Sequence, residues 1–192
     1  MDLFDDPLPR LWLLTDTRRA PRRDVIGLFN WSNTNATFAT SLDRVGLPAD
    51  HDYVLFDFWS NQLLPLAKGR LDVSVPAQSC RILAVRPTVD RPQLLSTSRH
   101  VTQGIVDVLA EHWNRGANTL TGRSEVVAND PYELRVVLPD NGQHWSVARA
   151  ELSATDQAAG STITVNARDG LVRATIHAAT SREVGWTLGF RR

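Results

Sequence analysis

Few side chains of this 192-residue sequence have the types and spacing that catalysis or metal binding requires. The five histidines stand singly, without the His-x-His or His-Glu-x-x-His spacing that brings two ligands to one metal ion. No serine lies in a Gly-x-Ser-x-Gly turn, and no glycine-rich loop precedes a helix to hold a phosphate. We therefore expect no metal site, no nucleophilic triad and no bound cofactor.

Asp57 is the most unusual carboxylate of the chain, because it lies inside the otherwise apolar run Tyr53–Trp59. Its carboxyl group could serve as a catalytic acid or accept a hydrogen bond from a sugar hydroxyl. The structural alternative, which we favour, is an aspartate that pairs with an arginine or faces a neighbouring domain. A glycosidase would also need a second carboxyl group about 5–10 Å away across a cleft.

Three tryptophans lie at predicted strand ends or beside turns, where an indole can present its face to a sugar ring. They are Trp59, Trp113 and Trp145. Packing against the protein's own core is the alternative for each of them. Trp31 and Trp186 are predicted to lie in the core, because their strands are apolar throughout or alternate cleanly.

The elements that must position these residues are β-strands. Three short apolar runs bounded by turn formers predict the core strands of an antiparallel β-sandwich. These runs are Val25–Ser32, Asp52–Trp59 and Ser79–Val85. No long amphipathic helix and no repeat of fixed period is visible, so the fold class is all-β with few or no helices.

The run Asp52–Trp59 carries apolar side chains on both of its faces. Alternation places one set on one face, and this set is Val54, Phe56 and Phe58. The other face carries Tyr53, Leu55, Asp57 and Trp59. Because both faces are apolar, we expect both to be covered.

The second half of the chain restarts the strand pattern after a proline-punctuated segment, residues 86–92. Strands are predicted at residues 94–97 and 105–113 directly after this break. We therefore predict two tandem antiparallel β units, residues 1–86 and residues 87–192.

Two hairpins and a final strand are predicted in the second unit. A Pro-Asp-Asn-Gly turn separates Tyr132–Leu138 from Trp145–Leu152, and an Arg-Asp-Gly turn separates Thr162–Ala167 from Leu171–His177. The last strand is Glu183–Phe190. Its inward side chains are predicted to be Val184, Trp186, Leu188 and Phe190.

The overall charge and composition exclude several classes of partner. Lys plus Arg equals Asp plus Glu at 21 each, so the chain lacks the basic field that nucleic acid or an anionic membrane surface would need. No apolar run approaches the roughly 20 residues of a membrane span, and the acidic N-terminus lacks a signal peptide's plan. Cys80 is the only cysteine, which excludes an intramolecular disulfide and suits an unreactive buried thiol. We expect a soluble protein, and its compartment stays open.

Five segments share their order and residue types with one known kind of domain. They are Asp2–Phe4, Pro9–Trp12, Asp24–Trp31, Tyr53–Trp59 and Ser79–Pro87. In this order they resemble the β-domain that follows the catalytic barrel in α-galactosidase-like (melibiase-type) glycoside hydrolases. Residues 90–104 look like the link onward into a second β-unit of some of those enzymes, so the likeness covers residues 1 to about 138.

The resemblance implies an accessory region without catalysis. The family's two catalytic aspartates lie on a (β/α)₈ barrel, which needs about 250 residues of alternating strand and helix. This chain has neither, so no catalytic residue is carried over. The implied role is to pack on a catalytic barrel, with Tyr53, Leu55 and Trp59 as candidate docking residues. We expect an exposed apolar patch, and a homodimer through it when the barrel is absent.

Two other functions stay open. A stand-alone carbohydrate-binding module would need two or three of the edge tryptophans on one face, beside hydrogen-bonding groups. A small glycosidase, the weaker alternative, would need a carboxylate pair gathered by the fold.

Overall fold

A computed structural model of the chain describes residues 8–19 and 21–192, so the predicted segment Asp2–Phe4 lies outside the described residues. In the described part, the chain forms fifteen β-strands and two short helices, η1 (Asp43–Val45) and α1 (Ala154–Ala158). All strand pairs are antiparallel. The all-β prediction is therefore confirmed. None of the described helices has the length and apolar character that a membrane span requires.

The chain divides into two compact units. Unit 1 comprises Met1–Asp16 and Arg23–Thr88, and unit 2 comprises Thr17–Arg22 and Val89–Arg192. The short segment Thr17–Arg22 thus groups with the second half of the sequence, although it lies between two strands of the first.

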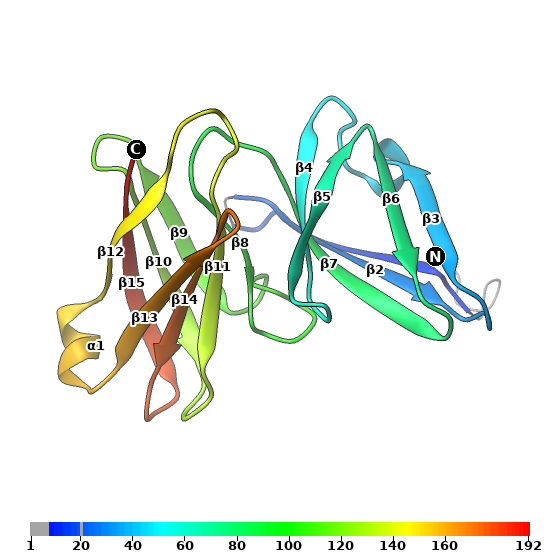
Figure 1. Ribbon diagram of the computed structural model, residues 1–192. Coiled ribbons are helices and arrows are strands. Elements are labelled where there is room, and N and C mark those ends of the chain that lie inside the picture. Colours follow the sequence, from blue (N-terminus) through cyan, green and yellow to red (C-terminus); the bar gives the residue numbers. More distant parts are fainter. Residues whose placement is uncertain (1–7, 20) are drawn as a thin grey trace. The chain divides into compact units, whose positions relative to one another are not determined.

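Unit 1 is built from one antiparallel sheet with the strand order β1-β2-β7-β4-β5-β6-β3 (Figure 1). Its strands are β1 (Leu11–Asp16), β2 (Arg23–Asn30), β3 (Ala36–Ser41), β4 (Asp52–Asp57), β5 (Gln62–Lys68), β6 (Arg70–Val75) and β7 (Ser79–Pro87). β5 and β6 pair only at Lys68 and Arg70, around Gly69 with φ of 65°. The sheet turns there, and one hydrophobic core joins side chains of β2, β7 and β4 to those of β3 and β6.

The three predicted core strands are confirmed as neighbours in the order β2-β7-β4. β4 is buried on both faces, as its apolar pattern indicates. Its alternation sends Tyr53 and Leu55 into the core of unit 1, together with Leu83 and Val85 of β7. Val54 and Phe56 therefore lie on the opposite face, which we call the outer face of the sheet.

Unit 2 is a sandwich of two four-stranded sheets (Figure 1). One sheet has the order β12-β15-β10-β9 and the other β13-β14-β11-β8. The strands are β8 (Gln93–Thr97), β9 (Val108–Asn114), β10 (Thr119–Val126), β11 (Tyr132–Val137), β12 (Ser146–Leu152), β13 (Thr162–Arg168), β14 (Leu171–His177) and β15 (Arg182–Arg191). Apolar side chains of both sheets form its core, including the predicted inward set of β15: Val184, Trp186, Leu188 and Phe190.

One of the two predicted hairpins is confirmed. β13 and β14 pair with Arg168 opposite Leu171, and the two loop residues between them have positive φ, 51° for Asp169 and 75° for Gly170. This is the conformation that a two-residue turn between antiparallel strands needs.

The other predicted hairpin is wrong. β11 pairs with β8 and β14, whereas β12 pairs with β15 in the opposite sheet. The predicted turn at residues 139–142 therefore carries the chain from one layer to the other. Gly142 does take the positive φ expected of it, 75°. The turn signal is local, but strand partners are set by distant residues.

Two further strands differ from the prediction. The strand expected at residues 105–113 begins only at Val108, because the preceding segment forms turns in which Gln103 and Gly104 have positive φ. β10 has no counterpart in the prediction. Its inward positions include Gly122, where a Cβ atom would lie 2.2 Å from Cζ2 of Trp186. At this position the Trp186 indole of β15 fills the core space that a side chain of β10 would otherwise occupy.

Candidate functional site

Asp57 is a structural residue of unit 1. Its carboxylate, 1% exposed, forms an ion pair with Arg81 of β7. It also accepts hydrogen bonds from the Ser60 hydroxyl (2.6 Å) and the Trp59 backbone N–H (3.3 Å). Every oxygen of the carboxylate therefore has a donor, and the charge is matched by a guanidinium. The prediction that Asp57 pairs with an arginine is confirmed.

The candidate docking residues need a correction. Tyr53 and Leu55 are 1% and 3% exposed, and both belong to the core of unit 1. Both faces of β4 are apolar, so the sequence pattern alone did not tell which face turns inward. Their burial leaves no surface of these side chains for a partner. Trp59 differs, because it lies in the turn after β4 and is 55% exposed with its ring edge-on to Phe58.

An exposed aromatic surface lies instead on the outer face of unit 1, at β1 and β2. Trp12 is paired with Gly27, and the ring of Phe29 lies beside Gly27 on the same strand face. Trp12 is edge-on to Phe29 (6.3 Å between centroids), and Trp31 stacks on it (5.6 Å, 9° between planes). Leu14 shares the face of Trp12 by alternation. We call Trp12, Leu14, Phe29 and Trp31 the outer aromatic surface.

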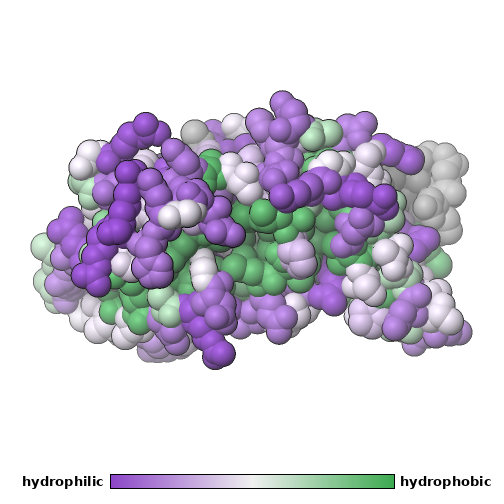
Figure 2. All heavy atoms as spheres, turned by 45° about the horizontal axis from the view of Figure 1, so that its top comes forward, coloured by the Kyte–Doolittle hydropathy of each residue, from purple (hydrophilic) through white to green (hydrophobic). Residues whose placement is uncertain are grey.

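The members of this surface are solvent-exposed to an unusual degree. Trp12 is 49% exposed, Leu14 45% and Trp31 50%. Other hydrophobic residues also reach the surface among hydrophilic ones, as the green areas of Figure 2 show for one face. The prediction that Trp31 lies in the core is wrong, because Trp31 follows the last residue of β2 and so escapes the buried part of the strand. The run of four apolar residues at Leu11–Leu14, on an edge strand, was the sequence signal for such a surface.

Unit 2 brings two of the candidate sugar-binding tryptophans together. The rings of Trp113 and Trp145 lie edge to face with centroids 6.1 Å apart, and Phe190 is 6.0 Å from Trp113. Trp145 is only 5% exposed, and the guanidinium of Arg192 lies 4.8 Å from its ring centroid. The indole of Trp145 is therefore a packing element, and its predicted role as an exposed sugar platform needs this correction. Trp113 is half-buried and keeps part of its ring accessible.

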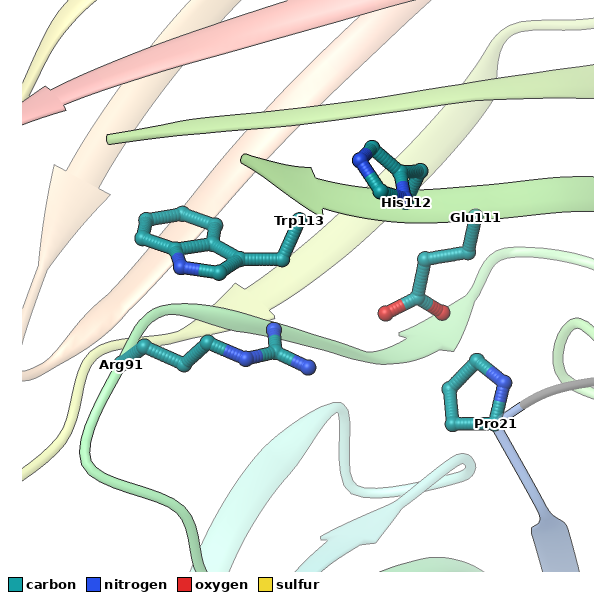
Figure 3. Close-up of a pocket in the computed structure, with 5 residues that line it drawn as sticks. All are labelled: Pro21, Arg91, Glu111, His112 and Trp113. Atoms are coloured by element: carbon teal, nitrogen blue, oxygen red, sulfur yellow. The ribbon is translucent and has the colours of Figure 1, made fainter. Parts of the chain in front are cut away.

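A pocket of about 320 Å³ opens beside Trp113 (Figure 3). It is lined by Pro21, Arg91, Glu111, His112 and Trp113, all of unit 2. The side chains of Glu111 and Trp113 leave β9 on one face and that of His112 on the other, as strand alternation requires. The guanidinium of Arg91 lies 5.4 Å from the centroid of the Trp113 ring. The pocket thus combines an indole, a proline ring, one cationic group and one carboxylate.

The segments that line this pocket are fixed by hydrogen bonds. Arg19 donates to the carbonyl of Val108 at 3.3 Å, which holds the segment bearing Pro21 against β9. Asn141 donates to the carbonyl of Asp90 at 3.2 Å, and this fixes the loop that carries Arg91. The pocket is therefore formed before any ligand arrives.

A buried polar cluster in unit 2 was not found from the sequence. Asp107, 5% exposed, accepts hydrogen bonds from Tyr132 Oη (2.6 Å), Thr97 Oγ1 (2.8 Å) and Gly104 N (3.1 Å). These bonds fix the turns before β9 onto β8 and β11. The only sequence signal was an aspartate between Val106 and Val108, which does not by itself identify its donors.

A second cluster lies on β11 and β14. Glu133 accepts from Arg135 at 2.6 Å and from Arg173 at 2.7 Å. Burial lowers the pKa of Arg135 below its ordinary value, while the hydrogen bond to Glu133 opposes that change. Arg135 also donates to the carbonyl of Thr97 at 2.9 Å. The cluster is satisfied internally, so we assign it to stability.

Nowhere in residues 8–19 and 21–192 do three or more His, Cys, Asp or Glu side chains gather in a way that could hold a metal ion. Among the described residues, we take three groups as candidates for contact with a ligand or partner: the outer aromatic surface, Trp59 and the pocket beside Trp113.

Comparison with known families gives a match within the first half of the chain. A family model of the alpha galactosidase C-terminal beta sandwich domain matches residues 17–85. A search of curated proteins finds no match to the chain. The matched domain is the sandwich of these enzymes and not their catalytic domain. Two parts of the resemblance, residues 1–16 and residues 86 to about 138, lie outside the match. Residues 17–85 are thus similar to the C-terminal β-sandwich domain of alpha galactosidases.

Proposed function

We propose that this chain is a non-catalytic accessory region of an α-galactosidase-like glycoside hydrolase, and that unit 1 packs on a catalytic (β/α)₈ barrel. The match of residues 17–85 to the C-terminal sandwich of such enzymes supports the proposal. Docking itself is supported by the outer aromatic surface. Two of its members are half-exposed tryptophans near one edge of the sheet.

The position of β1 in the sheet supports docking at this surface. In the described part of the chain β1 pairs with β2 alone and is the edge strand of the sheet. Trp12, Leu13 and Leu14 on this strand are each at least 40% exposed. Soluble proteins normally protect such an edge with charge, proline or a covering element. Burying a large apolar side chain contributes about 1.5–3 kcal/mol of stabilisation. A partner that covers this surface would bury several such side chains, and their contributions would favour binding.

The proposed docking role requires no catalytic residue in this chain. The carboxylate most suited to catalysis by its sequence context, Asp57, is taken by Arg81 and two other donors. The accessory domain would act by holding the barrel's shape and by shielding its apolar surface from water.

We further propose that units 1 and 2 are separate domains, close to the division at residues 1–86 and 87–192. Each unit has its own hydrophobic core. Scanning calorimetry of the chain should then resolve two unfolding transitions, and a single two-state transition would argue for one cooperative domain.

The docking proposal is tested with an α-galactosidase-type catalytic barrel from the same organism, purified without its own C-terminal domain. The chain should bind this barrel saturably and raise its melting temperature. Replacing both Trp12 and Trp31 by serine should abolish the effect. Trp59→Ser is the matched control, because Trp59 is equally exposed on unit 1 but lies in the turn after β4. If Trp59→Ser alone abolishes binding, the docking surface lies at that turn; if no such barrel binds the chain, the proposal fails.

A further inference from the structure

The pocket beside Trp113 offers the combination of groups that a sugar ring requires. We propose that it binds one neutral pyranose ring, a function independent of any docking by unit 1. All of its lining residues belong to unit 2, which the family match does not cover beyond its short segment Thr17–Arg22.

The charge of the pocket favours a neutral ligand. Figure 3 shows the carboxylate of Glu111 and the guanidinium of Arg91 pointing into the space between Trp113 and Pro21. The positive charge of Arg91 and the negative charge of Glu111 balance each other, so the pair gives neither an anion nor a cation a net Coulomb attraction. A ligand with many hydroxyl groups can donate to the carboxylate and accept from the guanidinium at the same time.

The apolar groups of the pocket suit the C–H groups of a pyranose ring. A sugar ring presents C–H groups that need an apolar surface, and here the Trp113 indole and the ring of Pro21 supply it. The pocket volume, about 320 Å³, lies at the small end of the range for ligand sites. It therefore suits a single ring better than a long oligosaccharide.

The indole at the site is held rigidly. Trp145 and Phe190 contact the Trp113 ring from within unit 2, and Arg91 lies over it. Arg91 is itself restrained, since its Nη1 donates to the carbonyl of Pro92 at 3.1 Å. Little side-chain entropy would be lost on binding, which allows a small ligand to bind with a measurable affinity.

Fluorine NMR of the full chain labelled with 5-fluorotryptophan tests the proposal directly. Methyl α- and β-glycosides of galactose, glucose and mannose are the probes. At least one should shift the Trp113 resonance saturably, with a Kd of about 1 mM. Trp113→Phe assigns that resonance by removing it. The Trp59 resonance should stay unchanged as the internal control.

Two matched variants separate binding from folding. Glu111→Gln should weaken the sugar about tenfold, because a charged hydrogen-bond acceptor is lost while the side-chain shape is kept. Glu125→Gln makes the same change at an exposed position of the adjacent strand β10 and should leave the affinity unchanged. The proposal is overturned if no glycoside shifts Trp113, if Glu111→Gln binds as well as the wild type, or if zwitterionic amino acids bind in place of sugars.

Discussion

The rings of Phe29 and Trp31 lie stacked with their planes 9° apart, at the edge of a sheet where both are accessible to a partner. The Trp31 indole N–H donates to the carbonyl of Pro9 at 3.1 Å, which fixes the ring's orientation. Trp12 abuts the same Phe29 ring from β1. These contacts order the exposed rings in advance. An ordered aromatic cluster loses little conformational freedom on binding and is typical of the centre of an interface.

The outer aromatic surface should make the isolated chain self-associate. We predict a reversible monomer–dimer equilibrium, visible as a concentration-dependent sedimentation coefficient. Trp12→Ser and Trp31→Ser should each weaken the dimer about tenfold, since each removes an indole from the contact. Trp59→Ser should not. A chain that sediments as a monomer at every concentration would contradict the prediction.

The ion pair between Asp57 and Arg81 should be important for the stability of unit 1. Arg81→Met leaves a carboxylate that is 1% exposed without its cation, so urea denaturation should show a loss of about 3 kcal/mol in the free energy of unfolding. The matched control is Arg123→Met, which breaks an exposed pair with Glu183 and should cost at most about 1 kcal/mol. Equal losses in the two variants would show that burial does not matter here.

Gly122 should tolerate no side chain. A Cβ atom there would lie 2.2 Å from Cζ2 of Trp186 and 2.5 Å from the carbonyl oxygen of Ala110, so Gly122→Ala must displace the indole or the backbone. We expect a loss of about 3 kcal/mol, measured by chemical denaturation followed through tryptophan fluorescence. Gly116→Ala is the control, because the nearest atom to a Cβ there is 3.5 Å away. A stable Gly122→Ala protein would mean that Trp186 packs differently.

Asp107 should stabilise the turns that precede β9. Asp107→Ala removes the acceptor of Tyr132, Thr97 and Gly104, and leaves three buried donors unsatisfied. The expected loss is about 3 kcal/mol, whereas Tyr132→Phe, which deletes one donor only, should lose about 1 kcal/mol. Asp140→Ala at an exposed position should change the stability by less than about 0.5 kcal/mol. If Asp107→Ala behaves like Asp140→Ala, the cluster is not a source of stability.

Local patterns in the sequence predicted much of the fold. The apolar runs of β2, β4 and β7 identified the neighbouring core strands of unit 1, and the Asp-Gly turn identified the β13–β14 hairpin. The structural role of Asp57 also followed, since a lone carboxylate in an apolar strand needs a cation. In each case the signal is a local sequence pattern or the chemistry of a single residue.

The incorrect predictions concern features that depend on contacts between residues far apart in the sequence. The sequence of β10 gives a weak strand signal because its core position Gly122 has no side chain. The space there is filled by the indole of Trp186, which lies more than sixty positions away in the sequence. β11 and β12 flank a good turn, yet their partners are β14 and β15. Both faces of β4 are apolar, so alternation could not separate the core residues Tyr53 and Leu55 from an outer surface. The pocket beside Trp113 joins three separate segments and had only Trp113 as a sequence signal.

Hydrogen–deuterium exchange of the chain with and without an α-galactosidase-type barrel would locate the docking surface directly. We predict that the barrel slows exchange at the amides of β1, Leu11–Asp16, and around Trp31, while the strands of unit 2 exchange as before. A complex with no added protection at β1, or with protection confined to unit 2, would contradict docking through the outer aromatic surface.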